Sequence, residues 1–291
     1  MVTAIIKALR PEQWLKNLVV FAGLIFANAF RNTTLVLDAF LAFIFFCLAS
    51  SAIYLINDIC DIEKDRQHPA KSSRPIASGR VSITTAGIIA AVLIIIALLG
   101  SILFLNEYFF IAVACYIVLL LMYSVSLKRV VIIDVMTIAA GFVLRAVGGA
   151  VAINVEISAW LIVCTTLLAL FLGFGKRRQE LVLLGENAGS HRLILKKYSI
   201  TFLDQLISIV TAATIVAYSI YTLYGDPSHK LGVKHLELTI PFVIYGIFRY
   251  LYLIHQECKG GSPTRILYTD LPILLCVLLW IGSIFVLMAI S

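Results

Sequence analysis

Residues 35–56 read LVLDAFLAFIFFCLASSAIYLI, and the chain continues directly as NDICDIEKD at residues 57–65. A helix needs roughly 20 apolar residues to cross a hydrocarbon core that is about 30 Å thick. The first segment meets that length, and the acidic segment follows where such a helix would leave the core. The stretch therefore predicts a membrane-spanning helix with carboxylates gathered at its end.

The rest of the chain repeats this apolar pattern. Of its 291 residues, 61% are hydrophobic and only 13% are charged, a composition outside the range of soluble globular domains. Helices satisfy their own backbone hydrogen bonds in lipid, and the runs are longer than the roughly ten residues of a barrel strand. Nine runs qualify: 17–30, which is rather short, 35–56, 83–104, 108–125, 132–153, 158–174, 200–224, 238–256 and 271–290. We therefore expect an all-α integral membrane protein with nine transmembrane helices.

Basic residues gather on one side of these predicted spans. Most of the 23 lysine and arginine residues fall in loops on the side of the N-terminus, whereas the opposite loops hold only Arg31, Lys230 and Lys234. Because cytoplasmic loops carry an excess of lysine and arginine, we expect a multi-pass protein of a bacterial-type cytoplasmic (inner) membrane. Its N-terminus would be cytoplasmic and its C-terminus outside. The asymmetry also explains the net charge of +7, so the expected partner is the lipid bilayer and not a nucleic acid.

The loops indicate where a polar site could be built. The chain has no Pro/Ser-rich linker, low-complexity tract or obvious repeat, so we expect a single transmembrane domain over residues 1–291. Two predicted cytoplasmic loops are long, at residues 57–82 and 175–199, whereas the loops on the other side are short. These two loops are the expected location of the functional residues.

The acidic segment arranges its side chains on one face of the predicted helix. At about 100° per residue, Asn57, Asp58, Asp61 and Asp65 fall within an arc of roughly 100°, whereas Glu63 faces away. Carboxylates that converge in this way repel one another unless a cation lies among them. Mg²⁺ is commonly held by a few carboxylates together with substrate phosphates. The four residues therefore predict a magnesium site that binds a phosphorylated substrate.

A simpler interpretation is a solvated helix end whose acids pair with Lys64, Arg66 and Lys71. The position at the membrane boundary favours the functional interpretation, because ionisable groups are costly there. The loop that follows, residues 66–80, reads RQHPAKSSRPIASGR and alternates basic residues with turn formers. Its bases suit phosphate oxygens, although each of them also fits the cytoplasmic excess of positive charge.

These motifs resemble the UbiA superfamily of intramembrane prenyltransferases. The signature NDxxDxxxD matches Asn57, Asp58, Asp61 and Asp65, and the KxxRPI-like loop matches residues 71–76. The resemblance implies a UbiA-like helical bundle that binds a diphosphate through Mg²⁺ at the first motif, with Asp58 and Asp61 as catalytic residues.

The second motif departs from the common pattern, because residues 171–181 read FLGFGKRRQEL where an aspartate-rich cluster is usual. Together with RPEQWLKN at 10–17, YSVSLK at 123–128, Asp134 and Arg145, this basic motif resembles the decaprenyl-phosphate phosphoribosyltransferase branch. The branch implies transfer of 5-phosphoribosyl from phosphoribosyl diphosphate (PRPP) to a polyprenyl phosphate. The substrate-binding residues it implies are Gln13, Lys16, Asn57, Lys71, Arg74, Tyr123, Lys128, Asp134, Arg145, Lys176, Arg177 and Glu180.

The expected charges of the substrates agree with this branch. PRPP and a lipid phosphate bring three phosphate-type groups to one site, each with up to about two negative charges, so the site needs many cations and few carboxylates. Lysine and arginine residues at four predicted helix ends would supply them: Lys16, Arg74, Lys128, Lys176 and Arg177.

Several alternatives stay open at this point. One is a prenyltransferase of the same fold that acts on an aromatic acid, such as a 4-hydroxybenzoate polyprenyltransferase. A transporter is less favoured, because its polar site would lie near the membrane midplane. Arg145, deep in the fifth predicted span, either contacts a phosphate or pairs with a polar neighbour.

Overall fold

The computed structural model describes residues 1–67, 71–184, 193–224, 235–257 and 259–290. His68, Arg192, Lys230 and Lys234 lie outside the described residues, as does the middle of the predicted loop 175–199. The described parts form helices joined by turns and contain no strand, so the all-α prediction is confirmed.

Eight helices are long and apolar enough to cross a membrane. They match the predicted spans from residue 35 onward: α3 (Thr33–Cys60), α5 (Ile83–Phe104), α6 (Glu107–Val125), α7 (Ile133–Ala152), α8 (Ala159–Leu184), α10 (Ile200–Tyr224), α12 (Ile240–His255), which follows η5 (Leu236–Thr239), and α14 (Leu271–Ile290). Shorter helices connect them: α1 (Val2–Leu9), η1 (Pro11–Phe21), α2 (Ala22–Phe26), α4 (Ile62–Gln67), η2 (Leu127–Arg129), η4 (Leu193–Lys197) and α13 (Pro263–Thr269).

The first predicted span, residues 17–30, is not one long α-helix. The chain enters η1 after Arg10, whose φ of 54° is left-handed, and this 3₁₀ helix passes into the five-residue α2. η1 packs against α3 and α7. A side chain at Gly149 on α7 would collide with the backbone carbonyl of Val20, so the two backbones lie in direct contact. A narrow 3₁₀ helix suits so close an approach.

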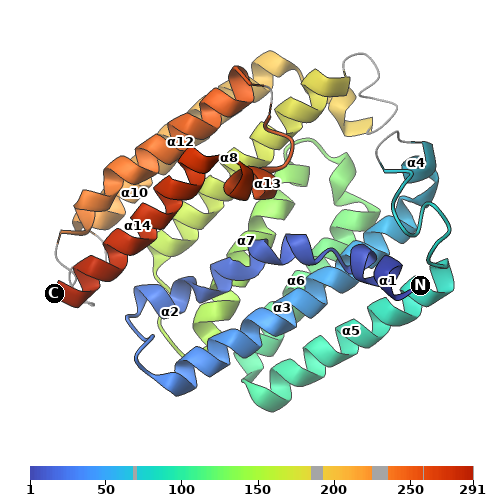
Figure 1. Ribbon diagram of the computed structural model, residues 1–291, viewed down its shortest axis with the longest axis horizontal. Coiled ribbons are helices and arrows are strands. Elements are labelled where there is room, and N and C mark those ends of the chain that lie inside the picture. Colours follow the sequence, from blue (N-terminus) through green and yellow to red (C-terminus); the bar gives the residue numbers. More distant parts are fainter. Residues whose placement is uncertain (68–70, 185–192, 225–234, 258, 291) are drawn as a thin grey trace. The chain divides into compact units, whose positions relative to one another are not determined.

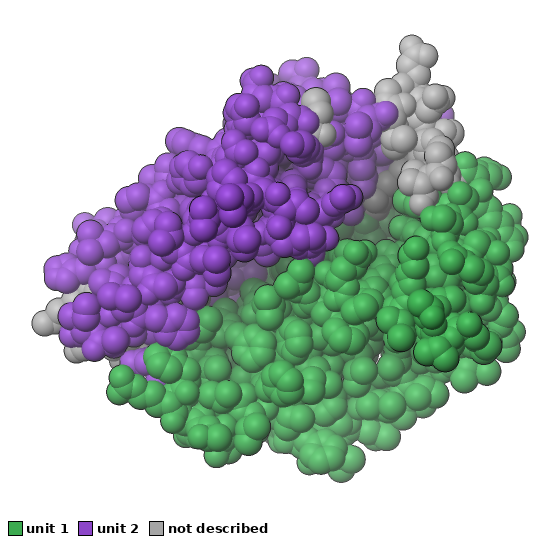
Figure 2. All heavy atoms as spheres, viewed as in Figure 1, with its two compact units in different colours: residues 1–25, 29–157 green, residues 26–28, 158–291 purple. Residues whose placement is uncertain are grey.

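The chain divides into two compact units (Figure 2), residues 1–25 with 29–157 and residues 26–28 with 158–291, here called unit 1 and unit 2. In unit 1, α3 packs on α5 and α6, and α7 packs on α6 and η1 (Figure 1). In unit 2, α10 packs on α8 and α12, and α12 packs on α14. The single-domain organisation over residues 1–291 stays a prediction.

Aromatic packing fixes α3 within unit 1. Phe46 on α3 meets the rings of Phe109 and Tyr116 edge to face, at 5.6 and 5.5 Å between centroids. A side chain at Gly148 would overlap the Phe46 ring, so α7 also lies close to α3. This packing holds the helix whose last turn carries Asn57 and Asp58.

Candidate functional site

The acidic motif spans a helix break in unit 1. α3 ends at Cys60, and Asp61 has φ −104° and ψ 10° before α4 begins. The expectation that the motif continues one straight helix is therefore wrong. The backbone N–H of Asp61 donates to both Asn57 and Ile59, which tightens the turn at this point. The i→i+4 hydrogen bonds from Asp61 to Asn57 (3.0 Å) and from Asp65 to Asp61 (2.8 Å) nevertheless keep the motif compact.

Asp58 and Asp65 share one guanidinium. Arg74 Nη1 donates to Asp58 Oδ1 at 3.0 Å and to Asp65 Oδ2 at 2.5 Å. Asp58 also accepts a hydrogen bond from Arg10 Nη2 at 2.5 Å. Both carboxylates are 3% exposed, so the two arginines supply the counter-charge that burial requires.

Asn57 and Asp61 share an ammonium group. Lys128 Nζ, on η2 after α6, donates to both carboxylate oxygens of Asp61 at 2.8 Å and lies 3.4 Å from Asn57 Oδ1. Glu63 points away from both pairs, as expected. Its side chain is 76% exposed and pairs with Arg66 at 3.1 Å.

Three cations contact these acids: Arg10, Arg74 and Lys128. The simpler interpretation, which expected Lys64, Arg66 and Lys71, named none of the three. Arg74 and Lys128, expected to meet phosphate, therefore contact carboxylates in this structure.

Arg145 is held by neutral partners inside unit 1. Its Nε donates to Asn17 Oδ1 (2.6 Å), its Nη1 to the Gly141 carbonyl (2.9 Å) and its Nη2 to the Tyr116 hydroxyl (2.6 Å). Asn17 in turn donates to Ser50 Oγ at 3.2 Å. Arg145 thus has the polar neighbours that one of the two alternatives required. Among the described residues no carboxylate forms an ion pair with it, and the buried guanidinium is held by these three neutral acceptors.

Sequence reasoning missed two residues that the structure places near the acids. Arg10 contacts Asp58 and also lies over the ring of Tyr54, 5.1 Å from its centroid. Tyr54 also lies close to Lys16. The signal for Arg10 was its position directly before Pro11 in the quoted motif, whereas nothing in the α3 pattern distinguished Tyr54 from other aromatic residues.

The remaining site residues that the sequence predicts in unit 1 lie on the segments next to these groups in the sequence. Gln13 lies on η1, and its backbone N–H donates to the Arg10 carbonyl at 2.9 Å. Asp134 is fully buried in the first turn of α7. Lys71 lies in the turn before Arg74, and Tyr123 is half-buried near the end of α6.

The basic second motif belongs to unit 2, at the end of α8. Arg177 is 1% exposed and pairs with Glu180 at 2.8 Å, whereas the more exposed Lys176 lies 4.0 Å from the same carboxylate. Arg178 pairs with Asp204 of α10 at 2.5 Å and lies 3.5 Å from the Ile254 carbonyl of α12. Arg178 therefore joins three helices of unit 2.

The donor atoms of the acidic motif suit a magnesium ion. As the side chains stand, no three acidic, histidine or cysteine groups of the described chain converge on one metal position, because Arg74 and Lys128 lie between the acids. In each pair, the two acidic or amide side chains nevertheless contact the same arginine or lysine, so two hard oxygen donors lie close together. Mg²⁺ is usually bound through one or two carboxylates and completed by substrate phosphates, so either pair fits it.

Comparison with known proteins shows the family of the chain. Residues 17–177 match the UbiA prenyltransferase family. The chain is 34% identical to the decaprenyl-phosphate phosphoribosyltransferase of Corynebacterium glutamicum, over 96% of this chain and 85% of that one. The enzyme of the same name from Mycolicibacterium smegmatis is 33% identical, over 98% and 92%. A solved UbiA homologue from Archaeoglobus fulgidus, bound to GPP and Mg²⁺, shares the fold with a TM-score of 0.74 at 19% identity, over 98% and 99% of the chains.

Proposed function

This chain belongs to the UbiA prenyltransferase family, and from that premise we propose that it transfers 5-phosphoribosyl from PRPP to a polyprenyl phosphate. The observation that carries the proposal is the identity of 34% over 96% of the chain with a decaprenyl-phosphate phosphoribosyltransferase. This match extends beyond the family region into the C-terminal part of the chain.

In the proposed reaction an oxygen of the lipid phosphate bonds to the anomeric carbon of the ribose. The bond from that carbon to the diphosphate breaks, and the diphosphate leaves with the electron pair. The lipid phosphate is already anionic at neutral pH, so no strong general base is required. Positioning of the two substrates should therefore carry much of the rate enhancement.

The acidic motif would hold the diphosphate end of PRPP. The oxygens of Asn57, Asp58, Asp61 and Asp65 are the ligands that would hold Mg²⁺, which when bound would neutralise the charge on the leaving diphosphate. Asp58 and Asp61 would lie nearest the reacting atoms, with Asp58 the candidate for contact with the ribose.

Cations of this chain would neutralise the phosphates. Arg74 and Lys128 already lie among the acids, and a phosphate that entered there would accept hydrogen bonds from both. Arg145 anchors Asn17 and thereby the part of η1 that carries Lys16 and Gln13. The further substrate-binding residues in the proposal are Lys71, Tyr123, Asp134, Lys176, Arg177 and Glu180.

We also propose the membrane arrangement. The charged loops would face the cytoplasm of a bacterial-type inner membrane, with the N-terminus inside and the C-terminus outside. The ninth crossing in this proposal is residues 17–30, which contain the second half of η1 and all of α2.

Purified protein in detergent tests the function. One reaction would contain PRPP and a polyprenyl phosphate, and the other a polyprenyl diphosphate and 4-hydroxybenzoate, each with Mg²⁺. We expect turnover of the first pair alone. Turnover of the second pair alone would assign the chain to the aromatic prenyltransferases of the family.

Lys176 and Arg178 should respond differently to alanine substitution. Loss of a charge-assisted phosphate contact at Lys176 should weaken binding by about 1.5–3 kcal/mol, a roughly ten- to hundredfold rise in apparent KM for a phosphorylated substrate. Arg178→Ala should leave KM unchanged but lower the melting temperature, because it leaves Asp204 without the ion pair at 2.5 Å. The measurements are KM for each substrate and thermal unfolding. Equal changes of KM in both variants would contradict a phosphate contact at Lys176.

A further inference from the structure

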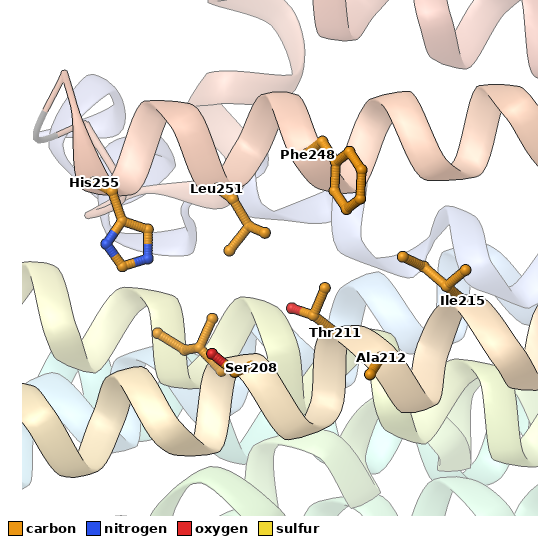
Figure 3. A pocket seen from close by; sticks show the side chains of 8 residues that line it. Ser208, Thr211, Ala212, Ile215, Phe248, Leu251 and His255 are labelled. Atoms are coloured by element: carbon orange, nitrogen blue, oxygen red, sulfur yellow. The ribbon is translucent and has the colours of Figure 1, made fainter.

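A groove lies between α10 and α12 in unit 2 (Figure 3), and none of the residues that line it belongs to the proposed reaction. Its volume is about 380 Å³, within the range of about 300–1,000 Å³ that is typical of small-molecule sites. The lining is mostly apolar, with three polar side chains. The lining residues are Ile207, Ser208, Thr211, Ala212, Ile215, Phe248, Leu251 and His255.

The hydroxyl of Thr211 distinguishes this groove from an ordinary gap between helices. Thr211 is 8% exposed, and among the described residues its Oγ1 has no hydrogen-bond partner. Its neighbours on α10 behave differently. Ser208, Thr214 and Ser219 each donate to the carbonyl four residues earlier, at 2.9, 2.6 and 2.8 Å. The Thr211 hydroxyl instead points into the space between α10 and α12 (Figure 3).

An unsatisfied hydroxyl is costly in this setting. Within the hydrocarbon region no water is available to complete its hydrogen bonding, and the penalty for leaving it unpaired is not offset. A ligand that satisfied Thr211 would need a hydrogen-bond acceptor attached to an apolar chain. The ester carbonyl of a glycerolipid has this form, whereas a polyprenyl chain carries no acceptor along its length.

The charges at one end of the groove indicate the headgroup. His255 lies at the same end as Ser208 (Figure 3). Arg178 lies beside it, 3.5 Å from the Ile254 carbonyl, and its charge is balanced by Asp204 at 2.5 Å. The exposed Lys196 and Lys197 lie just before the start of α10 and supply the positive charge at this end. This charge would attract the phosphate of an anionic lipid.

We propose that this groove binds an anionic glycerophospholipid, with an ester carbonyl accepting a hydrogen bond from Thr211 and the phosphate beside His255. The upper part of one acyl chain contacts the apolar lining at Ile215 and Phe248. The lipid is a bound component of unit 2 and takes no part in the transfer reaction.

Binding of phosphatidylglycerol to the full chain in detergent, followed by native mass spectrometry, tests this site. Thr211→Val keeps the shape of the side chain and removes the hydroxyl, so the dissociation constant should rise roughly threefold to tenfold, as for one neutral hydrogen bond. Thr214→Val is the matched control, because Thr214 lies on the same helix outside the groove lining, and it should leave the dissociation constant unchanged.

A diether analogue of phosphatidylglycerol, which has no ester carbonyls, isolates the proposed contact. The dissociation constant of the native protein should be roughly threefold to tenfold higher for the diether than for the diester. Thr211→Val should bind both lipids with equal affinity. Equal affinity of the native protein for both lipids would overturn the proposal. So would displacement of phosphatidylglycerol by polyprenyl phosphate, or a self-association that buries the groove. Retained turnover by Thr211→Val would show that the variant is folded.

Discussion

Asp61→Asn and Asp65→Asn should each abolish Mg²⁺-dependent turnover, whereas Glu63→Gln should retain most of it. Asp61, at the break after α3, and Asp65, on α4, each belong to one of the two bridged pairs. Glu63 points away, with its side chain 76% exposed. Asparagine preserves size but removes the negative charge that a divalent cation needs. Initial rates with PRPP and a polyprenyl phosphate, at saturating Mg²⁺, measure the effect.

Two controls separate chemistry from folding. Each variant should be compared at matched expression and with its melting temperature recorded, because Asp65 is buried and paired. Chelation of divalent cations should stop turnover in the native protein, and added Mg²⁺ should restore it. Equal loss of activity in all three variants would contradict the assignment of the acidic face, and activity that survives chelation would remove the metal from the reaction.

Arg74→Ala should cause the largest loss of stability, together with loss of activity. Arg74 is the common partner of Asp58 and Asp65, which are both 3% exposed. Removing one partner of a buried ion pair costs about 3–5 kcal/mol. Arg66→Ala is the matched control from the same region, since its ion pair with Glu63 is exposed and such pairs contribute about 0–1 kcal/mol. Its other contact is a single hydrogen bond from Nε to the Ala77 carbonyl at 3.2 Å, so its loss of stability should stay well below that of Arg74→Ala. Thermal unfolding in detergent measures both variants.

Magnesium gives this prediction a second test. Without Arg74 the freed carboxylates should bind Mg²⁺ more readily, so added Mg²⁺ should raise the melting temperature of Arg74→Ala more than that of the native protein. An unfolding temperature of Arg74→Ala equal to that of Arg66→Ala would contradict the role of Arg74 as a bridge. An Mg²⁺ effect no larger than in the native protein would contradict metal binding at Asp58 and Asp65.

Most of the fold was predictable because lipid imposes a simple rule. A long apolar run must become a helix in the membrane, and the runs from residue 35 onward match eight helices. Residues 17–30 do not form the single long α-helix that this rule predicts, because their conformation depends on tertiary contacts. The close approach of Val20 to Gly149 and the hydrogen bonds of Asn17 join segments far apart in the sequence.

The acidic cluster was predictable from the sequence, but its pairing was not. Helical spacing placed Asn57, Asp58, Asp61 and Asp65 on one face and directed Glu63 away. The structure shows the four as two bridged pairs across a helix break, with Glu63 exposed and outside both pairs. Helical spacing could not show that Arg10 and Lys128 would reach these acids, because such contacts depend on the packing of η1 and α6 against α3. The break at Asp61 was missed as well, since a tightened turn leaves no compositional signal.

Labelled PRPP offers the most direct test of the central claim. With one label on the ribose carbons, a second on the 5-phosphate and a third on the diphosphate, the first two should appear together in the lipid extract. The third should stay in the aqueous phase as diphosphate, because only the bond at the anomeric carbon breaks. Transfer that requires polyprenyl phosphate and is lost in Asp61→Asn is the predicted result. The protein must bind Mg²⁺ and show a thermal unfolding transition, which establishes that it is folded. Absence of ribose label from the lipid extract of such protein would contradict phosphoribosyl transfer by this chain.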